Sequence, residues 1–245
     1  MERLGDDGDL GRVLGVFAHP DDEAYLAGGL MTTAIDAGRR VVCVTATRGE
    51  LGFPDDDPRS IEERKNVRTT EMTACLGVLG VEEHHWLEYP DGGCADVPVA
   101  VAAERIRALI DDVRPDTVLT FGPDGQTFHP DHIAVGRWTT IACAASGHDQ
   151  RLLYATMTPD WATALGQYVD MADLMMTDAE PPTTPIDELS LWFVAEGEVL
   201  ERKTLALECQ ASQVAPLIAM AGREAFQTLN ADEVFRDPAP GDWTA

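Results

Sequence analysis

The sequence contains few basic side chains and almost no lysine. Only 18 of its 245 residues are lysine or arginine, against 43 aspartates and glutamates, so the formal net charge is −25. The two lysines are Lys65 and Lys203. A field of this sign repels nucleic-acid backbones and anionic lipid head groups, so we expect neither nucleic acid nor a membrane surface as a partner. Taken alone, the acidic excess is better explained by a solvated acidic surface than by a surface that attracts cations.

Long apolar runs and leader features are also absent. No stretch approaches the roughly 20 apolar residues that a membrane-spanning helix needs. The first residues, MERLGDDGDLGRV, are acidic and have neither the basic start nor the apolar centre of a secretory signal. We therefore expect a cytoplasmic protein. Its five cysteines include no Cys-x-x-Cys pair, which favours reduced thiols over disulfides or a cysteine metal site.

The remaining composition is that of an ordinary globular protein. Hydrophobic residues make up 44% of the chain and charged residues 25%. A chain of 245 residues suits one large domain, and we expect a single domain over residues 1–245 with its core at about residues 12–236. Composition leaves the oligomeric state open, a homo-oligomer included.

Apolar strand-like runs alternate with helix-length segments along the chain. The expected strands are residues 12–18, 40–47, 85–87, 117–121, 151–156 and 191–195, and the expected helices are residues 23–36, 60–79, 98–113, 131–145 and 198–212. This alternation predicts an α/β fold: a Rossmann-like three-layer α/β/α sandwich with a mostly parallel sheet. The proline-rich, acidic residues 175–188 predict a long loop, by default a passive connection and alternatively a lid.

Two histidine–aspartate motifs follow predicted strands. Residues 18–23 (AHPDDE) come after the first strand, and residues 129–132 (HPDH) come after the fourth, at residues 117–121. In an open doubly wound sheet these two strands are neighbours at the topological switch point, where ligands bind past the carboxyl ends. We therefore expect the two motifs to share one crevice and to form the active site there.

Histidine and carboxylate together suit zinc or a similar divalent cation. A catalytic zinc keeps three protein ligands and an open position for water, which leaves the other groups for acid–base work. The candidate groups are His19, Asp21, Asp22, His129, Asp131 and His132. Either motif alone could be only a turn in which proline fixes φ and aspartate caps a helix. The occurrence of two such motifs at equivalent junctions favours the metal.

The two motifs resemble those of the LmbE-like, or PIG-L, family of zinc-dependent de-N-acetylases, the N-acetylglucosaminyl deacetylase family. Weaker similarities extend the resemblance over most of residues 12–236. They are residues 47–52 (TRGELG), 68–71 with 76–78, 89–92 (YPDG), Lys203 with residues 212–213, and residues 233–236 (EVFR).

The resemblance implies roles for the six candidate groups. The family's zinc ligands correspond to His19, Asp22 and His132. Asp21 corresponds to the general base that activates water, and His129 to a group that stabilises the oxyanion or protonates the departing amine. Asp131 would orient His129 and stabilise its positive charge. The metal implied is Zn²⁺, although a histidine–aspartate site accepts other divalent ions.

A polar rim around the substrate is implied as well. Its residues correspond to Arg48, Glu50, Arg68 and Asp91. Surface ion pairing is the alternative, since Arg68 and Glu71 lie one helical turn apart. Some family members carry a tyrosine two residues before the histidine that matches His129, whereas Thr127 stands here.

Motifs and resemblance together predict a metal-dependent hydrolase that removes the acetyl group from an N-acetylated amino sugar, or its conjugate, by metal-activated water. The scissile bond would be a linear amide, and the partner a small molecule. An amidase that cleaves a glucosaminyl-inositol thiol conjugate is the alternative, because it needs the same metal centre. A non-catalytic ligand-binding protein with this fold is the second alternative.

Overall fold

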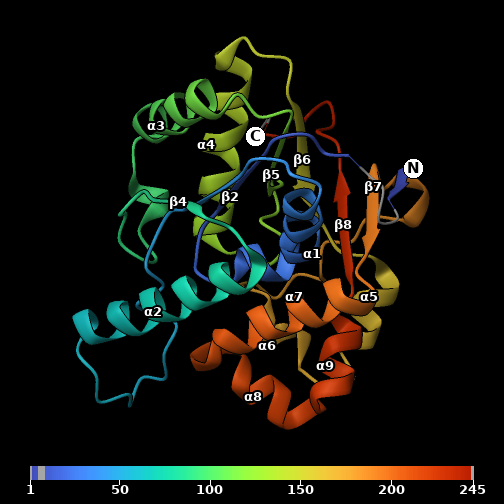
Figure 1. Cartoon of the computed structure of the whole chain (residues 1–245). Helices are drawn as coiled ribbons and strands as arrows, with labels where there is room; N and C mark the ends of the chain where they lie inside the picture. Colours follow the sequence, from blue (N-terminus) through green and yellow to red (C-terminus); the bar gives the residue numbers. More distant parts are fainter. Residues whose placement is uncertain (1, 5–8, 244–245) are drawn as a thin grey trace.

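A computed structural model describes residues 2–4 and 9–243, and an eight-stranded sheet runs through the middle of this part of the chain (Figure 1). The strands are β1 (Glu2–Leu4), β2 (Val13–Phe17), β3 (Val41–Thr45), β4 (Glu83–Trp86), β5 (Thr117–Phe121), β6 (Arg151–Ala155), β7 (Leu191–Val194) and β8 (Asp232–Arg236). Their order is β1-β7-β8-β6-β5-β2-β3-β4. The chain moves outward from β2 to β4 and then returns to β5 on the other side of β2, so the switch point lies between β2 and β5.

The sheet is parallel except at one strand. β8 runs antiparallel to both β6 and β7, while every other described pairing is parallel. The mostly parallel sheet predicted from the sequence is therefore confirmed. We did not expect a strand at β8, and β1 pairs with β7 ahead of the predicted start of the core.

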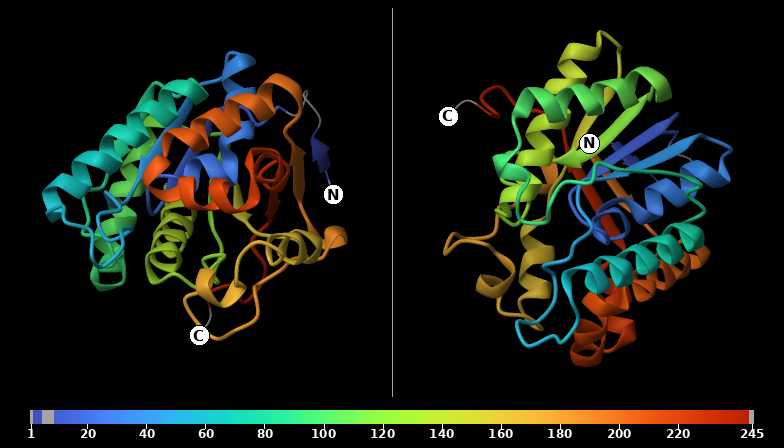
Figure 2. Two further views of the ribbon diagram at one scale, coloured as in Figure 1. Left: turned by 90° about the horizontal axis from the view of Figure 1, so that it is seen from below. Right: turned by 90° about the vertical axis from the view of Figure 1, so that its left-hand side faces the viewer.

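Helices cover both faces of the sheet, which completes the predicted three layers (Figure 2). They are α1 (Asp22–Asp36), α2 (Ile61–Leu79), α3 (Val99–Val113), α4 (Pro130–Ser146), α5 (Pro159–Leu165), α6 (Met171–Leu174), α7 (Gly197–Cys209), α8 (Ala211–Ala221) and α9 (Arg223–Leu229), with 3₁₀ turns at Cys94–Asp96 and Ile186–Glu188. α1 lies on one face, with α2 and α7 packed against it. α4 lies on the other face and carries α3.

Capping explains where α2 begins and ends. The Ser60 hydroxyl accepts the backbone N–H of Glu63, and the Glu63 carboxylate accepts the backbone N–H of Ser60 at 2.8 Å, which is the predicted capping box. The helix ends at Gly80, whose φ of 86° suits glycine.

The helix predicted over residues 198–212 is confirmed as far as Cys209, and only its last turn is wrong. α7 ends at Cys209, and the chain turns at Gln210 before α8 begins. The buried Gln210 amide lies 3.4 Å from a carboxylate oxygen of Glu23, a contact that the sequence pattern did not indicate.

The central strands are buried on both sides, which explains their uninterrupted apolar sequences. Every residue of β2, β3 and β5 is buried. α4 lies directly on β5, since a Cβ at Gly136 would collide with the backbone carbonyl of Phe121. This close approach fixes the helix whose first turn carries the HPDH motif. The five cysteines are free thiols, and four of them are buried.

A fully buried ion pair joins three elements beside the site. The Lys203 ammonium on α7 lies 2.7 Å from a Glu233 carboxylate oxygen on β8, and both side chains have no solvent exposure. Glu233 also accepts the backbone N–H groups of Gly29 (2.6 Å) and Leu30 (2.8 Å) on α1, while Lys203 donates to the carbonyl of Tyr25. The pair therefore fixes α1, the helix that begins in the AHPDDE motif.

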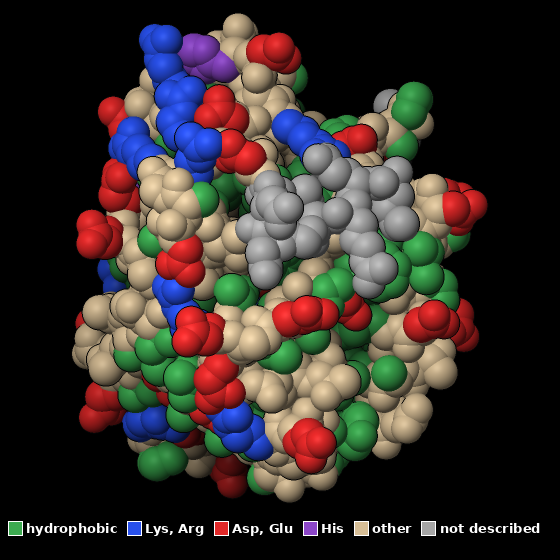
Figure 3. Space-filling model, turned by 45° about the vertical axis from the view of Figure 1, so that its right-hand side comes forward, with side chains coloured by type: hydrophobic (Ala, Val, Ile, Leu, Met, Phe, Trp, Pro, Cys, Tyr) green, Lys and Arg blue, Asp and Glu red, His purple; other side chains and the backbone are tan. Residues whose placement is uncertain are grey.

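The charged side chains lie mainly at the surface. On the face seen in Figure 3, acidic side chains are spread out rather than gathered into one patch, and several basic side chains collect at its upper left. Within residues 2–4 and 9–243, we find no helix with the length and apolar character needed to cross a membrane.

Candidate active site

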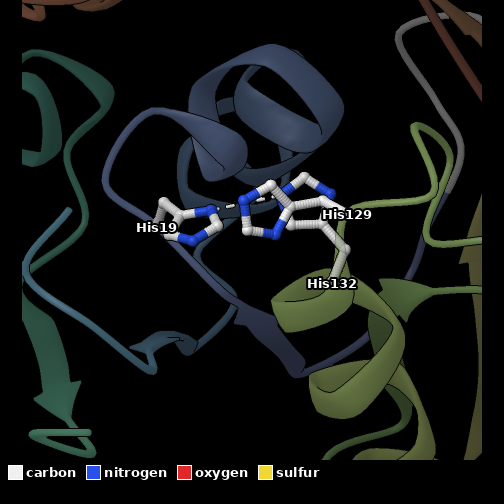
Figure 4. Close-up of side chains that lie close together, drawn as sticks. All are labelled: His19, His129 and His132. Atoms are coloured by element: carbon white, nitrogen blue, oxygen red, sulfur yellow. Dashed lines mark hydrogen bonds between the residues drawn. The ribbon is translucent and has the colours of Figure 1, made fainter. Parts of the chain in front are cut away.

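The two histidine–aspartate motifs meet at the carboxyl ends of β2 and β5, as the strand order predicted. These strands pair in parallel, with Val13 opposite Thr117. Residues 18–23 and 125–132 therefore leave the sheet at the same edge. Figure 4 shows the imidazoles of His19, from the loop after β2, together with those of His129 and His132, from the start of α4.

Two imidazole nitrogens face each other at hydrogen-bond distance. His19 Nδ1 lies 3.1 Å from His132 Nε2. His132 Nδ1 lies 2.9 Å from the Gly125 carbonyl oxygen, which can only accept, so the hydrogen sits on Nδ1 and Nε2 offers a lone pair. His19 Nε2 faces Asp91 (3.2 Å) and Asp131 (3.3 Å), so its Nδ1 likewise offers a lone pair. Two facing lone pairs require a proton or a metal cation between them.

The Asp22 carboxylate completes a triangle of side-chain groups with these two imidazoles. Its Oδ1 lies 3.5 Å from His132 Nε2, and its Oδ2 lies 3.7 Å from His19 Nδ1. Backbone N–H groups of Ala18 (3.1 Å) and His19 (2.8 Å) hold Oδ2 in place. Tetrahedral ligands about 2.1 Å from a metal lie about 3.4 Å from one another. The nitrogen–nitrogen separation of 3.1 Å is close to this value, whereas Asp22 approaches the two rings through different oxygens, Oδ1 at 3.5 Å and Oδ2 at 3.7 Å.

Within the described part of the chain, two other sets of three side chains bring possible ligand atoms together around His19. The ligand atoms of His19, His129 and His132 lie within 4.8 Å of one another, as do those of His19, Asp91 and Asp131. Asp91 and Asp131 contact the opposite nitrogen of His19 from the one that faces His132. They are thus better placed to orient His19 than to ligate beside it.

The charge of the histidine pair resides on His19. Burial lowers the pKa of His19, but hydrogen bonds to Asp131 and Asp91 and the charge of Asp22 outweigh burial and raise it to about 10. Burial and the charge of His19 lower the pKa of His132 to about 3. A proton on His19 Nδ1 would satisfy both facing nitrogens, and a divalent cation at this position would replace it.

Asp21 lies beside the triangle in an uncommon backbone conformation. Its φ is 104°, a region that non-glycine residues enter only when their surroundings enforce it. Its backbone N–H donates to Glu23 Oε2 at 3.0 Å, and its Oδ2 accepts from the Arg68 guanidinium at 3.0 Å. Burial raises the pKa of Asp21 to about 6, although Arg68 opposes the shift. A carboxyl group in this range can take up and return a proton near neutral pH.

Asp131 contacts a different histidine from the one we predicted. Its carboxylate accepts the backbone N–H groups of Gly92 (2.8 Å) and Cys94 (3.0 Å) and lies against His19, not His129. His129 Nδ1 instead accepts the backbone N–H of Asp131 at 3.1 Å, in the helix-capping position. The predicted orientation of His129 by the Asp131 carboxylate is therefore corrected to an orientation of His19.

His129 is consequently a neutral donor rather than an imidazolium. Burial, together with the charges of His19 and His132, lowers the pKa of His129 to about 4. Because its Nδ1 accepts a backbone N–H, the ring hydrogen is left on Nε2. A neutral N–H next to the metal position can donate to a developing oxyanion, but it is a poor source of a proton for an amine.

Arg68 and Asp91, two of the four predicted substrate contacts, line the cavity at the site. Arg68 is buried and donates to the carbonyl of Pro20 as well as to Asp21. Asp91 accepts the backbone N–H of Leu51 at 2.7 Å and faces His19. Arg68 thus holds Asp21, and Asp91 holds His19, from the lining of the cavity.

Arg48 and Glu50 are not among the described residues that line this cavity. The Arg48 guanidinium pairs with Glu88 at 2.5 Å and lies over the Trp86 ring. Glu50 is buried and accepts the backbone N–H of Asp91 at 3.3 Å. Arg48 therefore forms a surface ion pair, which was the alternative to substrate contact. Glu50 supports the loop that carries Asp91.

Sequence reasoning missed two parts of the site. One is Glu23, the last residue of AHPDDE, which holds the backbone of Asp21. The other is an extensive apolar lining of the cavity, whose volume is about 770 Å³. Its side chains come from segments that are far apart in the sequence, so no local pattern indicated them.

Replacing Asp131 with asparagine is expected to weaken metal binding about 10- to 100-fold, because the carboxylate fixes the tautomer and orientation of His19. Isothermal titration with zinc into metal-stripped protein measures the change. Asp111→Asn is the matched control, since the Asp111 carboxylate lies 3.1 Å from a surface histidine, His148. An Asp131→Asn variant that binds zinc as tightly as the control would contradict this role.

The fold and the histidine–carboxylate cluster together define an α/β protein of the LmbE-like deacetylase class. The model of the PIG-L family, described as GlcNAc-PI de-N-acetylase, matches residues 14–143. The match covers more than half of the chain, and the chain belongs to this family.

Individual relatives agree with this assignment. A 1D-myo-inositol 2-acetamido-2-deoxy-alpha-D-glucopyranoside deacetylase of Mycobacterium sp. strain JLS is 31% identical over 228 residues, covering 83% of this chain and 74% of the relative. The enzyme of the same name from Kineococcus radiotolerans is 36% identical over 253 residues, covering 83% and 69%. The N,N'-diacetylchitobiose deacetylase of Pyrococcus horikoshii shares the fold with a TM-score of 0.60 and 22% identity, covering 92% and 82% of the two chains.

Proposed function

We propose that this protein is a metal-dependent hydrolase that removes the acetyl group from an N-acetylated amino sugar or its conjugate. The observation that carries the proposal is the pair of facing nitrogens on His19 and His132, closed into a triangle by Asp22. Asp21 lies beside this triangle and supplies the base that hydrolysis needs. The relatives' names add the substrate class, since they describe deacetylases of acetamido sugars.

His19, Asp22 and His132 would hold the metal, with zinc as the expected ion. When bound, a divalent cation acidifies water and polarises a carbonyl group. Asp21, oriented by Arg68 and Glu23, takes the proton of the attacking water. As the water oxygen bonds to the amide carbon, the neutral Nε2–H of His129 donates to the carbonyl oxygen, where negative charge develops.

Collapse of the intermediate breaks the carbon–nitrogen bond. Asp21 returns its proton to the departing nitrogen, so one water and one amide give acetate and a free amine. This assignment uses His129 as a hydrogen-bond donor and Asp21 as base and then acid, in line with the pKa of each group.

Metal removal is the most direct test of the proposal. Protein stripped with a chelator is expected to lose acetate release from N-acetylglucosamine derivatives and to regain it with zinc. Because only the folded protein offers the three ligands, metal at 1,000 times its Kd should also stabilise the fold by about 4 kcal/mol, seen as a higher Tm. Elemental analysis monitors the metal content. Full activity of metal-free protein would refute the proposal.

A substrate panel separates the remaining alternatives. N-acetylglucosaminyl derivatives and a glucosaminyl-inositol thiol conjugate are compared at equal concentration, with acetate and free amine as readouts. Turnover of the thiol conjugate alone would favour the amidase. Metal-loaded protein that binds these sugars by calorimetry without turning any of them over would favour a non-catalytic binding protein.

A further inference from the structure

Tyr25 is a residue of the cavity that none of the catalytic steps above uses. It lies near the start of α1 and lines the cavity together with Asp21, Asp22 and Arg68. Its side chain is partly exposed. A tyrosine combines an apolar ring with a hydroxyl group that can both donate and accept a hydrogen bond. What this hydroxyl can bind depends on where the rest of the residue holds it.

The backbone and the ring of Tyr25 are held firmly. The backbone N–H donates to the carbonyl of Asp21 at 3.0 Å, which closes the first turn of α1. The carbonyl of Tyr25 accepts the buried Lys203 ammonium at 2.9 Å. The ring packs edge-on against the buried ring of Phe226, with 6.4 Å between the two centroids. These contacts give the hydroxyl a defined position before any ligand binds.

The geometry of α1 directs this side chain toward the expected base. Tyr25 follows Asp21 by one helical turn, and side chains at this spacing lie next to each other. Side chains of a helix also lean toward its N-terminus. α1 begins at Asp22, one of the expected metal ligands. The phenol of Tyr25 therefore leans toward Asp21, at the end of α1 that carries the metal-site residues.

The hydroxyl of Tyr25 is neutral and open to a ligand. Burial and the charge of Asp21 raise the pKa of Tyr25 above its ordinary value, although Arg68 opposes the shift. Within the part of the chain that the structure describes, this hydroxyl has no hydrogen-bond partner, and it is not one of the polar atoms sealed from solvent. The Tyr154 hydroxyl, by contrast, lies 2.7 Å from the Thr140 hydroxyl. Tyr25 thus offers the cavity an O–H group that can donate.

Two other polar side chains of the lining already have protein partners. The Arg68 guanidinium donates to the carbonyl of Pro20 and to the carboxylate of Asp21. The Gln213 amide donates to the carbonyl of Gly52 at 2.9 Å. These bonds hold the loops around the cavity. The Tyr25 hydroxyl holds no described part of the protein, so its hydrogen-bonding capacity is available to a substrate.

The position near Asp21 determines which part of an amino sugar this hydroxyl can reach. In the proposed function Asp21 returns its proton to the departing nitrogen, so this nitrogen lies close to Asp21 during the reaction. In a glucosaminide the carbon that bears the nitrogen has two ring neighbours. One carries the glycosidic oxygen, and the other carries a free hydroxyl, the 3-hydroxyl. A sugar hydroxyl that is buried without a partner costs free energy, so a partner at this point favours binding.

We propose that Tyr25 is a specificity-determining residue whose hydroxyl forms a hydrogen bond with the sugar hydroxyl next to the acetamido group. This inference rests on the proposed function and names a feature of the amino sugar that the site recognises. Tyr25 touches the substrate but exchanges no proton with it. Its contribution is therefore to binding and not to the chemical step.

Binding of product analogues tests the proposal without turnover. Methyl glucosaminide and its 3-deoxy analogue are titrated into zinc-loaded wild-type protein and Tyr25→Phe, which keeps the ring and removes only the oxygen. The variant should bind methyl glucosaminide about 2- to 10-fold more weakly, the range of one neutral hydrogen bond. Both proteins should bind the 3-deoxy compound with equal Kd. A wild-type Kd of Tyr25→Phe for methyl glucosaminide would overturn the proposal, as would equal weakening for both compounds or no binding by wild-type protein.

Tyr168→Phe is the matched control. Tyr168 is also partly exposed, but it is not among the described residues that line the cavity. The control should bind both compounds as tightly as wild-type protein. Elemental analysis should find the same zinc content in all three proteins, because neither tyrosine is an expected ligand. A Tyr168→Phe variant that loses as much affinity as Tyr25→Phe would overturn the assignment to Tyr25.

Hydrolysis assays distinguish this proposal from the proposed function. With methyl N-acetylglucosaminide, Tyr25→Phe should raise KM about 2- to 10-fold and change kcat by no more than about twofold. Acetate release with wild-type kinetics in Tyr25→Phe would overturn the role of Tyr25 and leave the proposed function intact. A loss confined to kcat would assign Tyr25 to the chemical step and overturn its role in binding. The expected pattern of Kd values in a protein that releases no acetate would refute the proposed function and support the role of Tyr25.

Discussion

Replacing Asp21 with asparagine is expected to lower kcat about 10²- to 10⁴-fold while zinc remains bound. The substitution removes the group that accepts the water proton but keeps a side chain of the same size beside Arg68. The three expected metal ligands are untouched. Acetate release and elemental analysis on the same preparation measure both quantities.

Asp55→Asn is the matched control for this variant. It replaces the same carboxylate with the same amide, but at an exposed loop position. The control should retain full activity and full zinc content. Wild-type kcat in Asp21→Asn would show that another group is the base. Loss of zinc from Asp21→Asn would instead place Asp21 among the ligands.

Replacing Lys203 with methionine is expected to destabilise the fold by about 3–5 kcal/mol, because it leaves the Glu233 carboxylate buried without its counter-charge. This is a large share of the roughly 5–15 kcal/mol by which proteins are stable. Urea unfolding at fixed metal concentration measures the free energy of unfolding. Arg202→Met removes a neighbouring cation whose pair with Asp36 is partly exposed, and it should cost about 1 kcal/mol or less.

The double variant Lys203→Met/Glu233→Gln sharpens this test. Glutamine keeps an acceptor for the backbone N–H groups of Gly29 and Leu30 but carries no charge. It should therefore recover part of the stability lost in Lys203→Met. The free energy of unfolding is also measured for Glu233→Gln alone. If the double variant loses as much stability as the two single variants added together, the unpaired charge of Glu233 is not the cause of the loss in Lys203→Met.

The meeting of the two motifs was predictable because it depends on strand order alone. β2 and β5 are short apolar strands in an alternating pattern, and such patterns place the first and fourth expected strands side by side. The capping box at Ser60 was predictable for a similar reason, since both partners lie within one turn.

The partner of Asp131 was not predictable, because the pattern HPDH does not give the direction of a side chain. That direction is set by two backbone N–H groups, of Gly92 and Cys94, which follow β4 far away in the sequence. β8 was missed for a comparable reason. Its five residues include three charged side chains, and one of them, Glu233, is stabilised by contacts with α1 and α7 that a local pattern does not indicate.

The scarcity of lysine gives this protein a single lysine handle for chemical labelling. Lys203 is fully enclosed, whereas the Lys65 side chain is 36% exposed and pairs with Glu50 at 3.5 Å. Glu50 in turn accepts the backbone N–H of Asp91, which lines the cavity. Of the two lysine side chains, only Lys65 is open to a fluorophore or surface linker, and it lies next to the loop that contacts His19.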